Sequence, residues 1–132
     1  MSVYLGRAAA VKRLLKGALM LRPFERAAGK RHWVSQSQSR LVAVEVEGDP
    51  VRRVSVTMPV SPGAGTILAQ VINEFHADSA TVRAWAEKEL LAWGARLGED
   101  PDAGLDVLIA SADRSTRLQR MGTAGVLLTI TV

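Results

Sequence analysis

Two runs of alternating apolar and polar side chains, residues 41–47 and 51–60, constrain the fold of this chain most strongly. Successive side chains of a β-strand point to opposite faces, so this alternation is typical of strands buried on one face. Gly48, Asp49 and Pro50 join the two runs and favour a tight turn. The sequence therefore predicts a β-hairpin whose apolar face needs a second layer to cover it.

The second layer is expected to be helical. Apolar residues over 67–75 form one stripe at helical spacing, and a further helix begins after Asp78 or Ser79, either of which can cap it. That helix carries Trp85 and Trp93 on one side, where we expect both to anchor the core. Gly98 is expected to end it in the left-handed conformation.

The last part of the chain returns to strand patterns. Residues 105–110 are a short apolar run of the kind buried on both faces, and residues 111–116 are expected to be a loop. Residues 123–132 alternate and are rich in β-branched side chains, which predicts a closing strand. The pattern shows no internal repeat. It predicts an α+β fold: an N-terminal basic helix, a β-hairpin, two helices and a C-terminal strand pair, forming one sheet with the helices packed against it.

Apolar residues recur at helical spacing over residues 3–22, and Pro23 favours a helix boundary there. Residues 24–34 are expected to add a short helical turn. A run of Ser and Gln follows with no apolar member, which is typical of a loop. At 132 residues the chain fits a single domain. Its expected organisation is a basic helical segment at 1–34, a polar linker at 35–40 and an α+β body at 41–132.

Charge is distributed unevenly along the chain. Residues 1–40 contain nine Lys or Arg and one acid, a net charge of +8, whereas residues 41–132 contain eight basic residues and twelve acids, a net charge of −4. The first part is therefore expected to attract an anionic partner. The basic residues expected to contact nucleic acid or a partner are Arg7, Lys12, Arg13, Lys16, Arg22, Arg26, Lys30 and Arg31.

Several partners suit such a basic helix. DNA phosphates attract it without regard to sequence, an anionic membrane surface would suit a sharply two-faced version, and mitochondrial import signals have a similar composition. The acidic body of a neighbouring copy is a further partner. The helix can also be a solvated face that docks its apolar stripe on the domain.

Motifs of known chemistry are not found. The glycine-containing turn at 62–66 lacks the lysine of a P-loop, and Asp100, Asp102 and Asp106 lack the calcium-loop pattern, which leaves a capped acidic turn. His32 and His76 have no metal-ligand spacing, and His76 is expected to be a solvated residue at a helix end.

No nucleophile-elbow pattern surrounds Ser111 or Ser115, and the chain contains no cysteine. We therefore expect a protein that is not an enzyme, with no catalytic residue, cofactor, metal or small-molecule substrate. Charges interrupt every apolar run, so no transmembrane segment is expected.

Three parts of the chain carry a resemblance to a known family: the strand at 51–60, which the chain leaves through Pro59 and Pro62, the Trp-bearing helix at 81–97, and a polar stretch that leads into an alternating last strand, "SADRSTRLQRMGTAGVLLTITV". In element order and length the chain resembles the tail-terminator and tail-completion proteins of long-tailed phages. The helix at 67–75 is an addition to the simplest version of that pattern.

The resemblance implies a homo-oligomeric, ring-forming structural protein at the head–tail junction, in the virion or the host cytoplasm. It also implies neighbouring structural proteins as partners, non-specific contact with DNA, and neither cofactor nor catalysis. Two other classes stay open: a cytoplasmic nucleic-acid-binding domain and a small enzyme with a noncanonical site.

Overall fold

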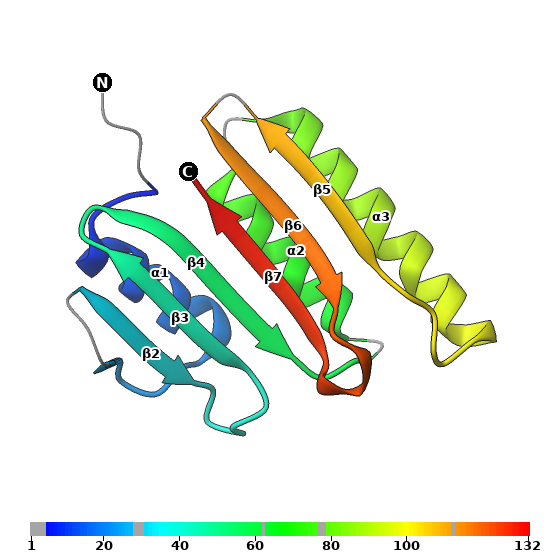
Figure 1. The fold of residues 1–132 in the computed structure, drawn as a ribbon, viewed down its shortest axis with the longest axis horizontal. Coiled ribbons are helices and arrows are strands. Elements are labelled where there is room, and N and C mark those ends of the chain that lie inside the picture. Colours follow the sequence, from blue (N-terminus) through cyan, green and yellow to red (C-terminus); the bar gives the residue numbers. More distant parts are fainter. Residues whose placement is uncertain (1–4, 28–30, 62, 77–78, 112) are drawn as a thin grey trace.

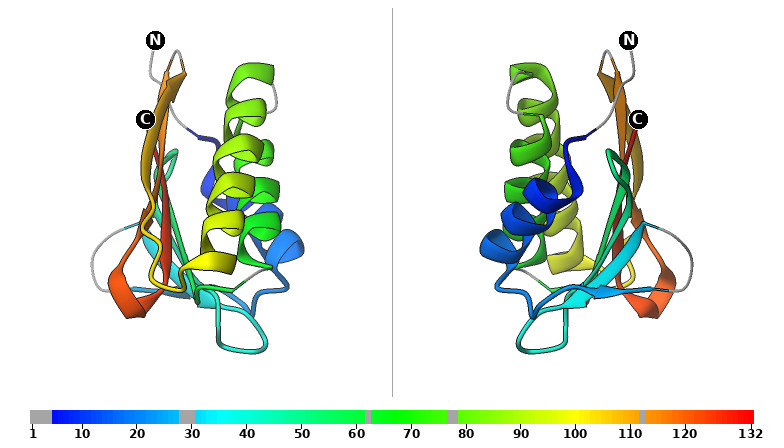
Figure 2. Two further views of the ribbon diagram at one scale, coloured as in Figure 1. Left: turned by 90° about the vertical axis from the view of Figure 1, so that its right-hand side faces the viewer. Right: turned by 90° about the vertical axis from the view of Figure 1, so that its left-hand side faces the viewer.

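The computed structural model describes residues 5–27, 31–61, 63–76, 79–111 and 113–132. In these residues three α-helices cover one face of a seven-stranded antiparallel sheet, and its other face carries no element (Figures 1 and 2). The predicted α+β fold is therefore confirmed. The elements are α1 (Ala8–Leu19), β1 (Glu25–Arg26), β2 (His32–Gln36), β3 (Ala43–Gly48), β4 (Val51–Met58), α2 (Ala64–Phe75), α3 (Ala80–Glu99), β5 (Asp106–Ser111), β6 (Arg114–Arg120), the 3-10 turn η1 (Gly122–Ala124) and β7 (Val126–Thr131).

Strands β3 and β4 form the predicted hairpin, which is confirmed. Val44 lies opposite Val56 and Val46 lies opposite Val54, and all four side chains are buried because they face the helices. The intervening side chains point to the open face and are mostly polar. Such alternation is what an antiparallel sheet with one covered face requires.

The N-terminal region differs most from the prediction. Helix α1 is confirmed, but it ends at Leu19, because the left-handed backbone of the following residue, Met20 (φ 52°), stops the helix before Pro23. The helical turn predicted at 24–34 is wrong, because the described residues of this stretch contain β1 and the start of β2, while residues 28–30 lie outside the described residues. The linker predicted at 35–40 begins inside β2, where the Ser35 hydroxyl is buried and donates to a backbone carbonyl at 2.6 Å.

The predicted division of the chain into a segment at 1–34 and a body at 41–132 does not correspond to two structural units. Its boundary falls within β2, which pairs with β3 along its whole length. Helix α1 also supplies buried side chains to the same core as β3 and β4, namely Ala8, Val11, Leu15 and Leu19.

Helices α2 and α3 lie where the sequence predicts them. Ser79 caps α3 by accepting a hydrogen bond from the backbone N–H of Val82 at 3.2 Å. The predicted stop at Gly98 is wrong, because α3 continues through it. Trp93 is fully buried and its indole N–H donates to a backbone carbonyl at 3.2 Å, whereas Trp85 packs against the core only in part.

The closing strand β7 is confirmed, but its neighbours were partly misread. The loop predicted at 111–116 is wrong, because β6 begins at Arg114. Strand β5 is not buried on both faces as expected. It lies at the edge of the sheet and its Leu108 side chain is 64% exposed.

The two halves of the sheet have the same connectivity, although the sequence shows no internal repeat. Apart from the two-residue strand β1, which lies between α1 and β2, helix α1 is followed by β2, β3 and β4, and α3 is followed by β5, β6 and β7. Strands β4 and β7 are antiparallel neighbours at the centre, so the strands of the two halves lie about an approximate twofold axis (Figure 1). The N-terminal and C-terminal halves of the chain therefore occupy opposite ends of one sheet.

Candidate functional site

The structure describes seven of the eight basic residues predicted to contact a partner, and Lys30 lies outside the described residues. All seven belong to α1, to the residue before it, or to the stretch from its end to the start of β2. Lys12 is half-buried and the other six are exposed. The structure thus brings helical and strand residues together at one end of the sheet.

Trp33 of β2 lies beneath two of these cations. The Nζ of Lys12 is 4.4 Å from the centroid of the indole ring, and the Cζ of Arg26 is 6.0 Å from it. The negative face of an indole ring attracts cations at such distances. Trp33 therefore holds two charges in place and has its ring occupied by them, which argues against a role in stacking a base.

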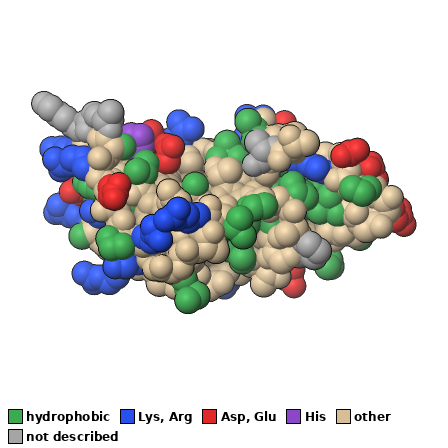
Figure 3. Space-filling view, turned by 90° about the horizontal axis from the view of Figure 1, so that it is seen from below, with side chains coloured by type: hydrophobic (Ala, Val, Ile, Leu, Met, Phe, Trp, Pro, Cys, Tyr) green, Lys and Arg blue, Asp and Glu red, His purple; other side chains and the backbone are tan. Residues whose placement is uncertain are grey.

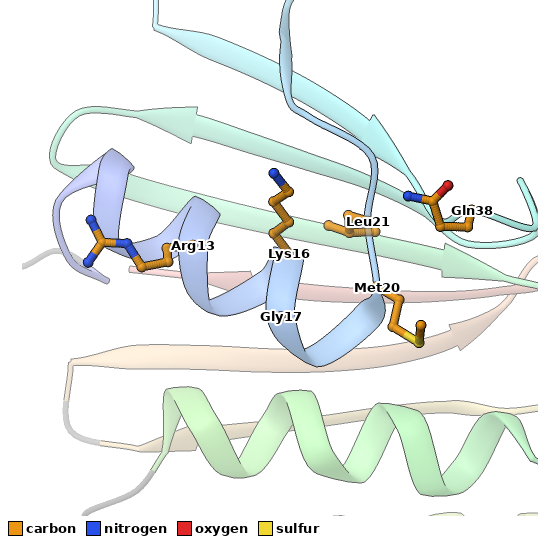
Figure 4. A pocket seen from close by; sticks show the side chains of 6 residues that line it. All are labelled: Arg13, Lys16, Gly17, Met20, Leu21 and Gln38. Carbon is orange, nitrogen blue, oxygen red and sulfur yellow. The ribbon is translucent and has the colours of Figure 1, made fainter.

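The end of α1 borders a cleft of about 460 Å³ (Figure 4). Arg13 and Lys16 come from α1, whereas Gln38 reaches the cleft from the connection between β2 and β3. Gly17 leaves space beside them, since a Cβ built there would meet no atom within 4 Å. Met20 at the rim is 73% exposed. Two cations beside apolar surface suit a partner that carries anionic groups.

Opposite charges gather at the two ends of the molecule. Residues 1–60, which form α1 and β1 to β4, contain eleven Lys or Arg and four acids, a net charge of +7. Residues 61–132, which form the rest, contain six basic residues and nine acids, a net charge of −3. Seen from below, most Lys and Arg gather at one end, where some acids also lie, whereas the charged side chains at the other end are mainly Asp and Glu (Figure 3). The fold thus turns a charge split along the sequence into a dipole across the sheet.

Strand β5 leaves one edge of the sheet unpaired in the described part of the chain. Its central residues Val107 to Ala110 carry no charge and no proline, and Leu108 projects from the open face. Proteins usually protect edge strands with charges, proline or a covering element, because free N–H and C=O groups can pair with another strand. The β5 edge is therefore suited to pairing with a second chain.

His76 is buried, so its prediction as a solvated residue is wrong. Its Nε2 and the hydroxyl of Thr116 in β6 are hydrogen-bonded at 2.5 Å. Arg114 holds the same corner by donating to the carbonyl of Phe75 at 2.7 Å. Burial lowers the pKa of His76, the positive charge of Arg114 lowers it further, and the negative charge of Asp113 opposes both effects.

The sequence predicts no metal site, yet three side chains that can bind a cation meet on the open face. The Nε2 of His32 lies 3.3 Å from an oxygen of Glu45 and 3.9 Å from an oxygen of Glu47. Glu45 and Glu47 share a face of β3, and His32 is the register partner of Glu47 on β2. The two acids were visible in the sequence as an i, i+2 pair. His32 was set aside as a ligand because it has no metal-ligand spacing in the sequence, and its segment was predicted as helical.

The remaining acidic candidates have structural partners. Asp100 accepts a hydrogen bond from the backbone N–H of Asp102 at 3.0 Å, as expected of an acidic turn. The Arg117 guanidinium donates two hydrogen bonds of 3.0 Å to the Asp106 carboxylate in a bidentate ion pair. These hydrogen bonds lower the pKa of the Asp106 carboxyl group. Glu45 and Glu47 make no ion pair with Arg52 or Arg53 within 4 Å among the described residues.

No helix in the described ranges is long and apolar enough to cross a membrane. Comparison of the chain with protein-family models, with curated proteins and with solved structures found no match in any of the three.

Proposed function

We propose that this chain is a self-assembling structural subunit that forms a ring, in the role of a tail terminator or head–tail connector of a phage-like particle. The observation that carries the proposal is the opposite charge of the two ends of one sheet. A subunit with complementary ends associates head to tail, and such contacts give a closed ring when the rotation between subunits closes.

The two sheet edges support the same arrangement. One end is the unpaired β5 strand, and the other is β2, which β1 covers over only two residues. If β5 of one copy continued the sheet of the next, α3 of the first would approach α1 of the second, because both helices lie on the same face (Figure 2). The acidic half would then meet Lys12, Arg13 and Lys16.

A charge placed on the β5 edge tests this arrangement. Leu108→Lys is expected to reduce the oligomer to monomer, because an inserted lysine opposes edge-to-edge pairing. The side chain is exposed, so the fold should survive. Met121→Lys, in the turn between β6 and β7, adds the same charge away from both edges and should leave the mass unchanged. Light scattering gives the masses, and equal behaviour of the two variants would refute the proposed edge.

A second candidate, a small nucleic-acid-binding domain, is favoured by the basic cleft at the end of α1. It predicts binding of a fluorescently labelled DNA duplex that weakens steeply with salt, with a log–log slope near −0.9 per phosphate contacted. The double variant Arg13→Ala, Lys16→Ala should reduce that slope by about two. A monomer with this behaviour would favour the second candidate over the first.

A further inference from the structure

Three potential metal ligands lie within 4.8 Å of one another on the open face of the sheet: His32, Glu45 and Glu47. Two come from β3 and one from β2, in strands paired over their whole length. Their positions therefore depend on the sheet register and not on a loop. Sites built on regular elements hold their ligands more firmly than sites built on loops.

The spacing of the donor atoms matches zinc coordination. With metal–ligand bonds of about 2.0–2.2 Å and tetrahedral angles, donor atoms on a zinc ion lie about 3.2–3.6 Å apart. The Nε2 of His32 is already 3.3 Å from Glu45 and 3.9 Å from Glu47. All three donor atoms lie within 4.8 Å of one another, so the Glu47 carboxylate must move closer to the other two to complete the set.

The charges around the three residues also favour a cation. Two carboxylates lie close together, and neither has a Lys or Arg nitrogen within 4 Å among the described residues. Arg53 is the register partner of Glu47 on β4 but makes no such contact. A divalent ion between the carboxylates would offset their mutual repulsion.

The mixture of donors selects the kind of metal. One imidazole nitrogen with two carboxylate oxygens suits zinc and neighbouring transition metals, whereas calcium and magnesium prefer oxygen ligands alone. Three protein ligands on an exposed face leave a fourth position for water or for a donor from another molecule. We propose that His32, Glu45 and Glu47 form a binding site for a divalent transition metal, with zinc as the reference ion. This site does not depend on the proposed assembly.

Isothermal titration of the full-length, tag-free chain with zinc chloride tests the site. We expect one ion per chain, and we expect excess magnesium not to compete. His32→Ala and Glu45→Gln should each weaken zinc binding about tenfold or more. Asp106→Asn is the matched control, because its carboxylate lies on the same open face but pairs with Arg117. It should bind zinc as the unaltered chain does.

Cobalt provides a second measurement on the same proteins. A four-coordinate cobalt ion with this donor set should give visible absorption bands that His32→Ala abolishes and Asp106→Asn retains. All three altered side chains lie outside the hydrophobic core, and circular dichroism will verify that each variant is folded. Absence of zinc binding by the unaltered chain, or equal binding by His32→Ala, would overturn the proposal.

Discussion

His76 shows how the environment of a single residue alters its chemistry. The side chain lies at the end of α2, but β6 covers it and leaves it only 4% exposed. Its hydrogen bond to Thr116 provides a polar partner inside the core. A buried imidazole next to the positive charge of Arg114 favours the neutral form, so the folded chain resists protonation at this position.

The stability of the chain should therefore fall in mildly acid solution. The pKa of His76 in the fold lies below its ordinary value of 6.5, so between these two values the unfolded state binds more protons. The free energy of unfolding therefore rises with pH in this window. It falls as the pH falls, by up to about 1.4 kcal/mol per pH unit. Urea denaturation at a series of pH values from neutral to mildly acid will measure it.

The variant His76→Gln is the control for this effect, since Gln keeps a hydrogen-bonding group but does not titrate. Its free energy of unfolding should vary less with pH in the same window. Asp106 and Asp113 do not complicate the comparison, because their pKa values lie below 3.8 and their contribution is lost only in more acid solution. Identical pH profiles for His76→Gln and the unaltered chain would contradict this account.

At the scale of elements, α1 is both a basic surface and a part of the core. Its exposed side carries Arg13 and Lys16, while Leu15 on the opposite side is fully buried. One alternative from the sequence was that the helix docks its apolar stripe on the domain and leaves its charged face in solvent. That alternative describes how α1 packs. The same helix can still bind a partner, because its cations face solvent.

Deletion of residues 1–34 should consequently destroy the fold. It removes α1, β1 and the start of β2, and it exposes the apolar side chains of β3 and β4 that α1 covers. We expect the truncated chain to lose cooperative thermal unfolding and its near-ultraviolet circular dichroism. The full-length double variant Arg13→Ala, Lys16→Ala should change the free energy of unfolding by no more than about 0.5 kcal/mol. Cooperative unfolding of the truncated chain would show that α1 is dispensable.

The elements that the sequence predicted well are those with a strong periodicity of their own. Strands β3, β4 and β7 alternate, and α1, α2 and α3 carry apolar stripes, so local pattern alone identifies them. Strand β2 is different. Its residues Ser35 and Gln36 resemble a loop, and they become strand because β3 supplies a partner along its length. Strand β6 was missed for the same reason, since it is polar and lies between β5 and β7.

The candidate sites were predictable to a smaller extent. The basic residues could be read directly from the sequence because charge does not depend on the fold. The approach of His32 to Glu45 and Glu47 depends on the register between β2 and β3. The sequence does not define this register, because it does not define the geometry of the connection between the two strands. The exposure of Leu108 likewise follows from the place of β5 at the sheet edge, and an apolar run alone cannot distinguish an edge strand from a buried one.

At the scale of the whole molecule, the topology separates the charges. The sheet order places the first half of the chain at one end and the second half at the other, with β4 and β7 meeting in the middle. The two halves have net charges of +7 and −3, so the basic end of one copy attracts the acidic end of another. Because the two ends differ, the contact in the proposed assembly would be heterologous, and it would give a closed ring where the rotation between subunits closes.

The mass of the unaltered chain in solution, measured by light scattering over a range of salt concentrations, tests this account most directly. We expect one discrete mass of several subunits at low salt, with partial dissociation as salt rises. Salt screens exposed charges beyond a distance of about 10 Å at 0.1 M, and this distance shortens at higher salt. A strict monomer of 14.2 kDa at every salt concentration would contradict the account.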